Sequence, residues 1–184
     1  MLTRDFLVDF KTATEQRWSQ HSIDPAIFGF QFQRGTLWNP GLSDREIAEY
    51  EHVVGVRFPH DFRVFLRMMN GTDIANLNVY GYCGEPHRTS FEFYSYPRDL
   101  DIVKQQIEKA RKSRDEIAAD LKGQGFDLSK EAGLVPIYSH RYLVCMPNLN
   151  NSAVLSIVVD AVDAIVCSKS LQDFLEHEFL KQQR

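Results

Sequence analysis

The apolar positions of residues 39–73 predict two short amphipathic helices joined by a tight link. In each helix the apolar side chains recur at spacings of three and four, which places them on one helical face. They are Ile47, Tyr50 and Val54 in the first helix, and Phe62, Phe65, Leu66 and Met69 in the second. Both apolar faces need a surface to pack on, and the rest of the chain must supply it.

The ends of these helices are also marked in the sequence. Ser43 is a favourable N-cap, and Glu46 three residues later completes a capping box. Gly55 suits the left-handed residue that ends a helix. Pro59 suits the start of the second helix, where a missing N–H costs nothing. The pair at 70–71, Asn-Gly, is expected to end it.

The same stretch carries a family resemblance. Its runs are LSDREIAEYE, GVRFPHDFRVFL and NG, and the later runs are LVPIYSHRYLVCMP and VLSIVVDAVDAIVCSKSLQDFLEHEF. Together they resemble the signature of the SUKH superfamily, the Smi/Knr-like proteins, over roughly residues 42–180. The resemblance implies closing strands followed by a short helix. It involves core positions rather than catalytic residues.

The remaining pattern adds helices before and after a meander of strands. Residues 3–20 and 98–122 show helical periodicity, and a last helix begins at the N-cap Ser170. Phe28, Phe30 and Phe32 alternate with polar or small residues, which predicts a strand with a phenylalanine face. Further strands are expected at 77–80, 91–94, 134–137, 142–146, 153–159 and 164–167. Residues 111–115, rich in Arg, Lys and Asp, are interpreted as a solvated helix face, with a binding patch as the alternative.

This order of elements predicts an α+β fold rather than an alternating βαβ one. We expect one domain over residues 1–184, with a mainly antiparallel, twisted, SUKH-like sheet of about four to six strands flanked by helices. Residues 1–35 are expected to be a helix-and-strand elaboration on the SUKH-like core at 42–180.

Composition narrows the class of protein. The chain has 184 residues, is 43% hydrophobic and carries a net charge of −4, so it lacks the basic balance of a nucleic-acid binder. The three cysteines, Cys83, Cys145 and Cys167, cannot all pair, and free thiols in a reducing cytoplasm are the simplest interpretation. Neither a signal peptide nor a membrane span is predicted, so we expect a cytoplasmic protein that binds no membrane.

No catalytic motif is evident. The chain has no P-loop, no G-x-S-x-G and no H-E-x-x-H sequence. Cys83, His87, His140 and Cys145 do not have the spacing of zinc sites, and no third group orients a Cys–His pair. Asp160 and Asp163 form a carboxylate pair in a predicted turn, where aspartates usually make local hydrogen bonds. We therefore predict no catalytic residue, no metal and no cofactor.

The leading hypothesis is a non-catalytic protein-binding domain. Many bacterial SUKH proteins are immunity proteins that neutralise a cognate secreted toxin, often a nuclease, and the resemblance implies this role here. An acidic inhibitor would gain association rate with a basic toxin from electrostatic steering. The candidate carboxylates are Asp44, Glu46, Glu49, Glu51, Asp160 and Asp163. Trp38 is interpreted as a core residue, with an anchor for the partner as the alternative.

Two alternatives remain open. The polar cluster at 139–142 includes His140 and Arg141, which are candidates either for contacting a partner or for covering the end of the sheet. A deep pocket lined by Tyr138, His140 and Arg141, with perturbed titratable groups, would favour a small-molecule sensor or an enzyme. The other alternative is an intracellular interaction module without a toxin partner.

Overall fold

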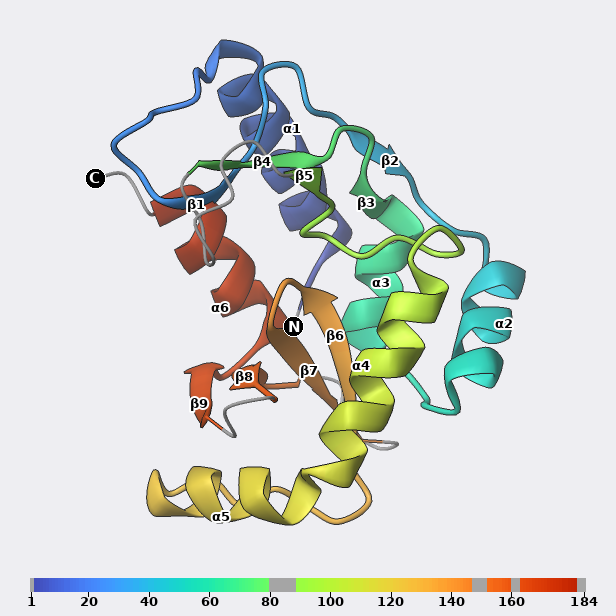
Figure 1. Cartoon of the computed structure of the whole chain (residues 1–184). Helices are drawn as coiled ribbons and strands as arrows, with labels where there is room; N and C mark the ends of the chain where they lie inside the picture. The colour runs from blue at the N-terminus through green and yellow to red at the C-terminus, as the bar shows by residue number, and fades with distance from the viewer. Residues whose placement is uncertain (1, 80–88, 147–151, 160–162, 182–184) are drawn as a thin grey trace.

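Three antiparallel sheets and the helices that flank them form an α+β fold in the computed structural model (Figure 1), which confirms the predicted class. The structure describes residues 2–79, 89–146, 152–159 and 163–181. The strands form three sheets rather than one, and the largest has four strands in the order β6-β7-β8-β9. Its strands are β6 (Gly133–Tyr138), β7 (Arg141–Cys145), β8 (Val154–Val158) and β9 (Asp163–Ser168).

Two smaller sheets extend this architecture. A three-stranded sheet has the order β1-β4-β5, and a two-stranded sheet pairs β2 with β3. Their strands are β1 (Gly29–Gln31), β2 (Trp38–Pro40), β3 (Met69–Thr72), β4 (Asn76–Val79) and β5 (Thr89–Ser90). The helices are α1 (Arg4–Gln20), α2 (Asp44–Val54), α3 (His60–Met68), α4 (Leu100–Lys112), α5 (Arg114–Gly123) and α6 (Leu171–Leu175), which continues as the π-helix η1 (Glu176–Lys181).

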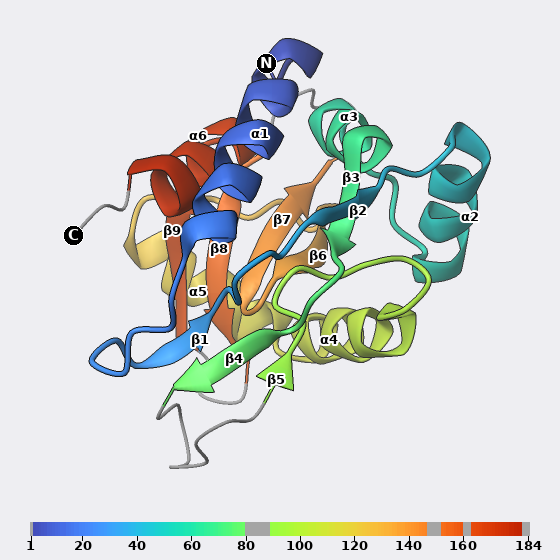
Figure 2. The ribbon, with the colours of Figure 1, turned by 90° about the horizontal axis from the view of Figure 1, so that it is seen from above.

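The four-stranded sheet is buried on both faces, and each face has its own hydrophobic cluster. Successive β7 residues point to opposite sides, so Leu143 joins the cluster containing α1, α3 and α6, whereas Tyr142 and Val144 join the one beneath α5. Figures 1 and 2 show α5 on one side of this sheet and α6 on the other. Leu7, Phe10 and Trp18 of α1 lie in the first cluster, so α1 shares its core with α2 and α3.

The helix-end predictions are confirmed in α2. Ser43 and Glu46 form both hydrogen bonds of the capping box, and Gly55 has the left-handed φ of 67° that ends the helix. At the other end of the chain, Ser170 caps α6 by accepting a hydrogen bond from the Asp173 N–H. These ends depend only on nearby residues, which is why the sequence indicates them.

The strand predicted to bury Phe28, Phe30 and Phe32 on one face differs in the structure. Phe28 lies outside β1 with 73% of its surface exposed, whereas Gln31 is buried. The Gln31 amide is satisfied inside the fold, because it donates to the carbonyls of Asp24 (2.8 Å) and Ile27 (2.6 Å) and accepts from the Asp24 N–H. A polar side chain therefore takes an inward position by organising the loop before the strand.

Two further boundaries differ from the expectations. The helix predicted at 98–122 is interrupted at Ser113, which ends α4 and begins α5. The strand predicted at 91–94 is replaced by β5 at 89–90, and Phe93 forms only an isolated bridge with Tyr138. Cys83, His87 and Asp160 lie outside the described residues, as does most of the turn at 148–152. Within the described ranges, no helix is long and apolar enough to cross a membrane.

Candidate functional site

Helix α2 presents three of the predicted carboxylates to solvent. Asp44, Glu46 and Glu49 are all exposed. Asp44 accepts a hydrogen bond from Nε of Arg67 on α3 at 2.6 Å, with 78% of its own side chain exposed. The hydroxyl and N–H of Ser43 donate to Glu46 and lower the pKa of its carboxyl below the ordinary value. The exposed face of α2 thus carries three carboxylates beside the exposed Arg45, and its first turn is held by the capping box.

Glu51 has a different role from the one predicted. Its side chain is only 11% exposed and pairs with Arg63 of α3, whose Nε and Nη2 both donate to it. The same carboxylate accepts the N–H of Phe58 at 2.5 Å. Glu51 therefore joins α2, the link after it and α3, and its charge is already neutralised by Arg63.

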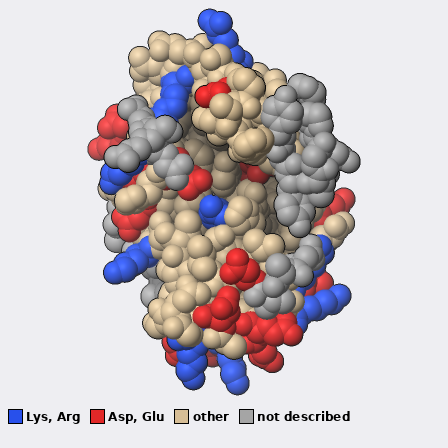
Figure 3. All heavy atoms as spheres, turned by 60° about the vertical axis from the view of Figure 1, so that its left-hand side comes forward, with Lys and Arg blue, Asp and Glu red and all other residues tan. Residues whose placement is uncertain are grey.

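Asp163 lies on another side of the molecule. It is exposed at the start of β9, whereas α2 lies beyond α3 and α4 in both ribbon views (Figures 1 and 2). Asp120 of α5 accepts the N–H of the neighbouring Ala164 at 2.8 Å, which adds a second carboxylate near Asp163. Figure 3 shows Asp and Glu side chains gathered on the lower part of the face that carries β9 and α5. The predicted carboxylates that the structure describes as exposed therefore lie on two separate surfaces, with Asp44, Glu46 and Glu49 on α2 and Asp163 on β9.

Trp38 is a core residue, which is the first of its two interpretations. It is only 4% exposed and packs against Phe10, Trp18, Phe65 and Phe93. Its indole N–H donates to Oγ1 of Thr14 at 2.8 Å. In this position the ring offers almost no surface to a partner.

His140 lines a cavity of about 280 Å³ between the β6–β7 turn, residues 90–94 and the end of β8. The turn is held by Ser139, which has a positive φ of 47°. The Ser139 N–H donates to the carbonyl of Glu92 at 2.7 Å, and its own carbonyl accepts the Tyr94 hydroxyl at 3.0 Å. Of the three residues predicted to line a pocket here, only His140 does so.

The other two residues are directed elsewhere. Tyr138 packs among Phe93, Phe174 and Phe179. Arg141 donates from Nη1 to the Ser156 hydroxyl at 2.9 Å and also to Nε2 of His140. Because Nε2 accepts, the His140 ring proton belongs on Nδ1, which lies 3.1 Å from the Ser139 hydroxyl.

The titratable groups around this cavity are perturbed by burial. Burial raises the pKa of Glu92, which is 6% exposed, although hydrogen bonds from Ser139 and Ser90 act in the opposite direction. Burial also raises the pKa of Tyr94 to about 12. Burial and the adjacent Arg141 guanidinium lower the pKa of His140, which agrees with a neutral ring that accepts from Arg141. The cavity thus joins a neutral histidine to a carboxyl that resists ionisation.

The structure offers no metal site among the residues it describes. Within those ranges no three His, Cys, Asp or Glu side chains gather closely enough to hold an ion. Cys145 and Cys167 are free, and burial raises the pKa of the Cys145 thiol. A buried thiol with a raised pKa is a poor nucleophile, so Cys145 is a core residue.

The comparison with protein families supports the predicted resemblance. The model of the SMI1 / KNR4 family (SUKH-1) matches residues 41–177, about three quarters of the chain. The chain belongs to this family. A search of the curated proteins found no match. The matched region of this SUKH domain begins just before α2 and ends within η1, so it includes the paired helices and the four-stranded sheet.

Three residues of these sites, Glu92, Tyr94 and Asp120, were not predicted from the sequence. Glu92 and Tyr94 reach the His140 cavity from a segment almost 50 residues earlier in the chain, through the contacts with Ser139. Asp120 was not singled out in the predicted helix at 98–122, although its carboxylate accepts the N–H of Ala164 on β9. The sequence around Asp120 does not indicate this hydrogen bond, because its donor and acceptor come together only when α5 packs against β9.

Proposed function

We propose that this SUKH domain is a non-catalytic protein-binding domain, acting as an immunity protein that neutralises a cognate toxin, possibly a nuclease, in the cytoplasm. The observation that carries the proposal is the acidic face of α2, where Asp44, Glu46 and Glu49 are exposed on a helix that is fixed at both ends. Membership of a family that contains immunity proteins supports the same role.

The rigidity of α2 matters for binding. The capping box fixes its first turn, and the Glu51–Arg63 pair fixes its last turn against α3. A surface that is already ordered loses little conformational freedom on association, so more of the interaction energy appears as affinity. The domain would block the active site of the toxin or the path of its substrate.

The charge of this face predicts how binding would depend on salt. Exposed carboxylates accelerate encounter with a basic partner, and salt screens this effect. The partner should first be isolated by affinity capture from the native cells and identified as a protein with a toxin domain. Its association with the wild-type domain and with the variants below can then be followed by surface plasmon resonance.

The test variant is Asp44→Asn/Glu46→Gln/Glu49→Gln, which retains the size of each side chain. Its matched control, Asp9→Asn/Asp101→Asn/Asp127→Asn, removes as many exposed carboxylates from other elements. We expect the first variant to lower the association rate constant by about tenfold at low salt and to protect cells less against the toxin. Equal losses in both variants would contradict a role for α2, and a partner without toxic activity would contradict the immunity role.

The His140 cavity supports a second candidate, a small-molecule sensor or an enzyme. The observation that favours it is a buried carboxyl and a neutral histidine at one cavity, since perturbed titratable groups often mark functional sites. A thermal-shift screen of small polar metabolites would test it with wild-type protein and His140→Ala. A compound that stabilises only the wild-type protein would support this candidate, and equal responses would exclude His140 from the site.

A further inference from the structure

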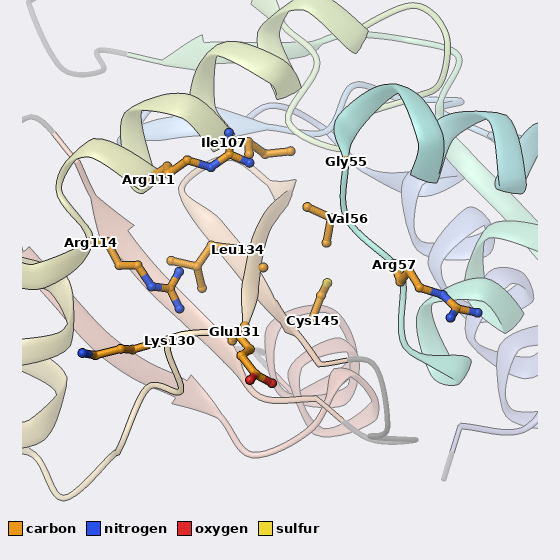
Figure 4. Close-up of a pocket in the computed structure, with 12 residues that line it drawn as sticks. Gly55, Val56, Arg57, Ile107, Arg111, Arg114, Lys130, Glu131, Leu134 and Cys145 are labelled. Carbon is orange, nitrogen blue, oxygen red and sulfur yellow. The ribbon is translucent and has the colours of Figure 1, made fainter.

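A cationic hollow of the described surface lies outside both candidate sites. A cavity of about 510 Å³ is formed by the link after α2, the junction of α4 and α5, and the start of β6 (Figure 4). Its apolar floor is formed by one side chain each from the link, α4, β6 and β7, which are Val56, Ile107, Leu134 and Cys145. A cavity of this size and lining is in the range used for small organic ligands.

The charged lining of this cavity has the opposite sign to the protein as a whole. Arg57, Arg111, Arg114 and Lys130 contribute to it, with Glu131 as the single carboxylate, although the chain has a net charge of −4. In Figure 4, Arg111 extends toward Ile107 and Arg114 toward Leu134, so both guanidiniums lie over the apolar floor. Lys130 points away from them. The cationic groups that face the interior are therefore the two arginines.

Arg114 is positioned by the fold but is not neutralised by it. Its Nη2 donates to the main-chain carbonyl of Ser129 at 2.5 Å, and among the described residues it forms no salt bridge. Burial lowers the pKa of Arg114, and the charge of Arg111 acts in the same direction while that of Asp115 opposes it. Arg111 donates from Nη1 to the exposed Glu108 carboxylate at 3.1 Å, which leaves its other donors available. An anion that contacts both guanidiniums would relieve their repulsion and occupy these remaining donors.

The floor of the cavity is closely packed. The ideal Cβ position of Gly133 lies only 2.4 Å from Cγ1 of Val56, so the start of β6 is in close contact with the link after α2. Glu51, which accepts the Phe58 N–H, holds the other end of that link. The apolar surface beneath the arginines is therefore already formed before any ligand arrives, which lowers the entropic cost of binding.

We propose that this cavity binds a small organic anion, in which a carboxylate or phosphate group is attached to an apolar body. Arg111 and Arg114 take the anionic group, because the planar guanidinium donates two parallel hydrogen bonds to either kind of oxyanion. The apolar body lies on the floor beside Val56 and Leu134. This site is independent of the toxin partner proposed for α2.

The proposal can be tested by isothermal titration calorimetry with four probes. Hexanoate and hexyl phosphate carry both features, hexanol lacks the charge, and inorganic phosphate lacks the apolar body. We expect saturable binding of at least one amphipathic anion, with affinity about tenfold or more above that of hexanol and inorganic phosphate. The preference between hexanoate and hexyl phosphate distinguishes a carboxylate ligand from a phosphate one.

The matched variants locate the site. Arg111→Gln/Arg114→Gln should weaken binding of the preferred anion by at least about tenfold. The control Arg4→Gln/Arg34→Gln removes the same charge, and Arg34, like Arg114, donates to a main-chain carbonyl. This control should bind as the wild-type protein does. If the double variant loses its fold, Arg111→Gln alone serves, because Arg111 is exposed and forms an ion pair with the exposed Glu108.

NMR provides a second readout, since amide shifts caused by the anion should concentrate at residues 56–57, 111–114 and 130–134. The proposal would be overturned by unchanged affinity in the arginine variant, by equal losses in the control, or by no binding of either amphipathic anion up to about 10 mM. Shifts located elsewhere on the protein would overturn it as well.

Discussion

Glu51 and Arg63 form the ion pair that joins α2 to α3. Nε and Nη2 of Arg63 donate to Oε1 of Glu51 at 3.0 and 2.7 Å, and Nη2 also donates to Oε2 at 2.6 Å. The Glu51 side chain is 11% exposed and that of Arg63 is 32% exposed, so water screens this pair only in part. Because Oε1 also accepts the N–H of Phe58, one carboxylate fixes both helices and the link between them.

Glu51→Ala should therefore lower the free energy of unfolding by about 2 kcal/mol, because it leaves a partly buried guanidinium and a main-chain N–H without their acceptor. Asp44→Ala is the control, since the Asp44–Arg67 pair joins the same two helices in solvent and should contribute less than about 0.5 kcal/mol. Urea denaturation of the two variants measures both values. Equal effects would show that Glu51 acts as an ordinary surface charge.

The buried hydrogen bond between Thr14 and Trp38 gives a second prediction. Thr14→Val keeps the shape of the side chain but leaves the indole N–H unsatisfied in the core, which should cost about 1–3 kcal/mol of stability. Thr14→Ser retains the hydroxyl and should recover much of this loss. Thr12→Val is the control, because Thr12 is exposed on the same helix. Thermal and urea unfolding of the three variants and the wild-type protein measure these differences. A Thr14→Val variant as stable as the wild-type protein would contradict the prediction.

Features that depend on neighbouring residues could be predicted from the sequence, and those that depend on packing could not. The capping box at Ser43 and the left-handed Gly55 are local, and both are present as expected. The role of Glu51 depends on Arg63, twelve residues later on another helix. Gln31 is buried by hydrogen bonds to the loop before β1 while Phe28 is exposed, and no alternation of apolar residues reveals this.

The candidate sites follow the same rule. The pattern at 139–142 indicated a polar cluster, but the carboxyl that shares its cavity, Glu92, comes from a distant segment. The basic residues at 111–114 were interpreted as solvated, because helical periodicity does not show that the chain turns at Ser113. This turn places Arg111 and Arg114 over one cavity.

Gly41 should be intolerant of a side chain. A Cβ at this position would lie 2.0 Å from the main-chain carbonyl oxygen of Arg67, where only backbone movement can make room. The close approach accompanies the hydrogen bond from the Leu42 N–H to the carbonyl of Leu66 at 2.7 Å. Gly41→Ala should therefore destabilise the protein by about 3 kcal/mol or more, as measured by urea denaturation.

Gly123→Ala is the matched control for this substitution. Gly123 is the last residue of α5, and a Cβ there meets no atom within 4 Å. Because alanine restricts the unfolded chain and favours the helix, this variant should gain up to about 1 kcal/mol. A tolerated Gly41→Ala would show that α3 and the strand before α2 are not in the close contact described.

Glu92 gives a prediction for the pH dependence of stability. Burial raises the pKa of its carboxyl above the ordinary value of 4.5, so the folded protein holds this proton at pH values where the unfolded chain has released it. The favourable contribution of the protonated carboxyl is complete below pH 4.5 and is lost as the pH rises through the folded pKa.

Glu92→Gln, which cannot ionise, should therefore be closest to the wild-type protein in acid and gain stability relative to it toward neutral pH. Urea denaturation of both proteins at several pH values measures this difference, with Glu108→Gln as the control for removal of an exposed carboxylate. A constant difference between Glu92→Gln and wild type across this range would show that Glu92 ionises as easily in the folded protein as in the unfolded chain.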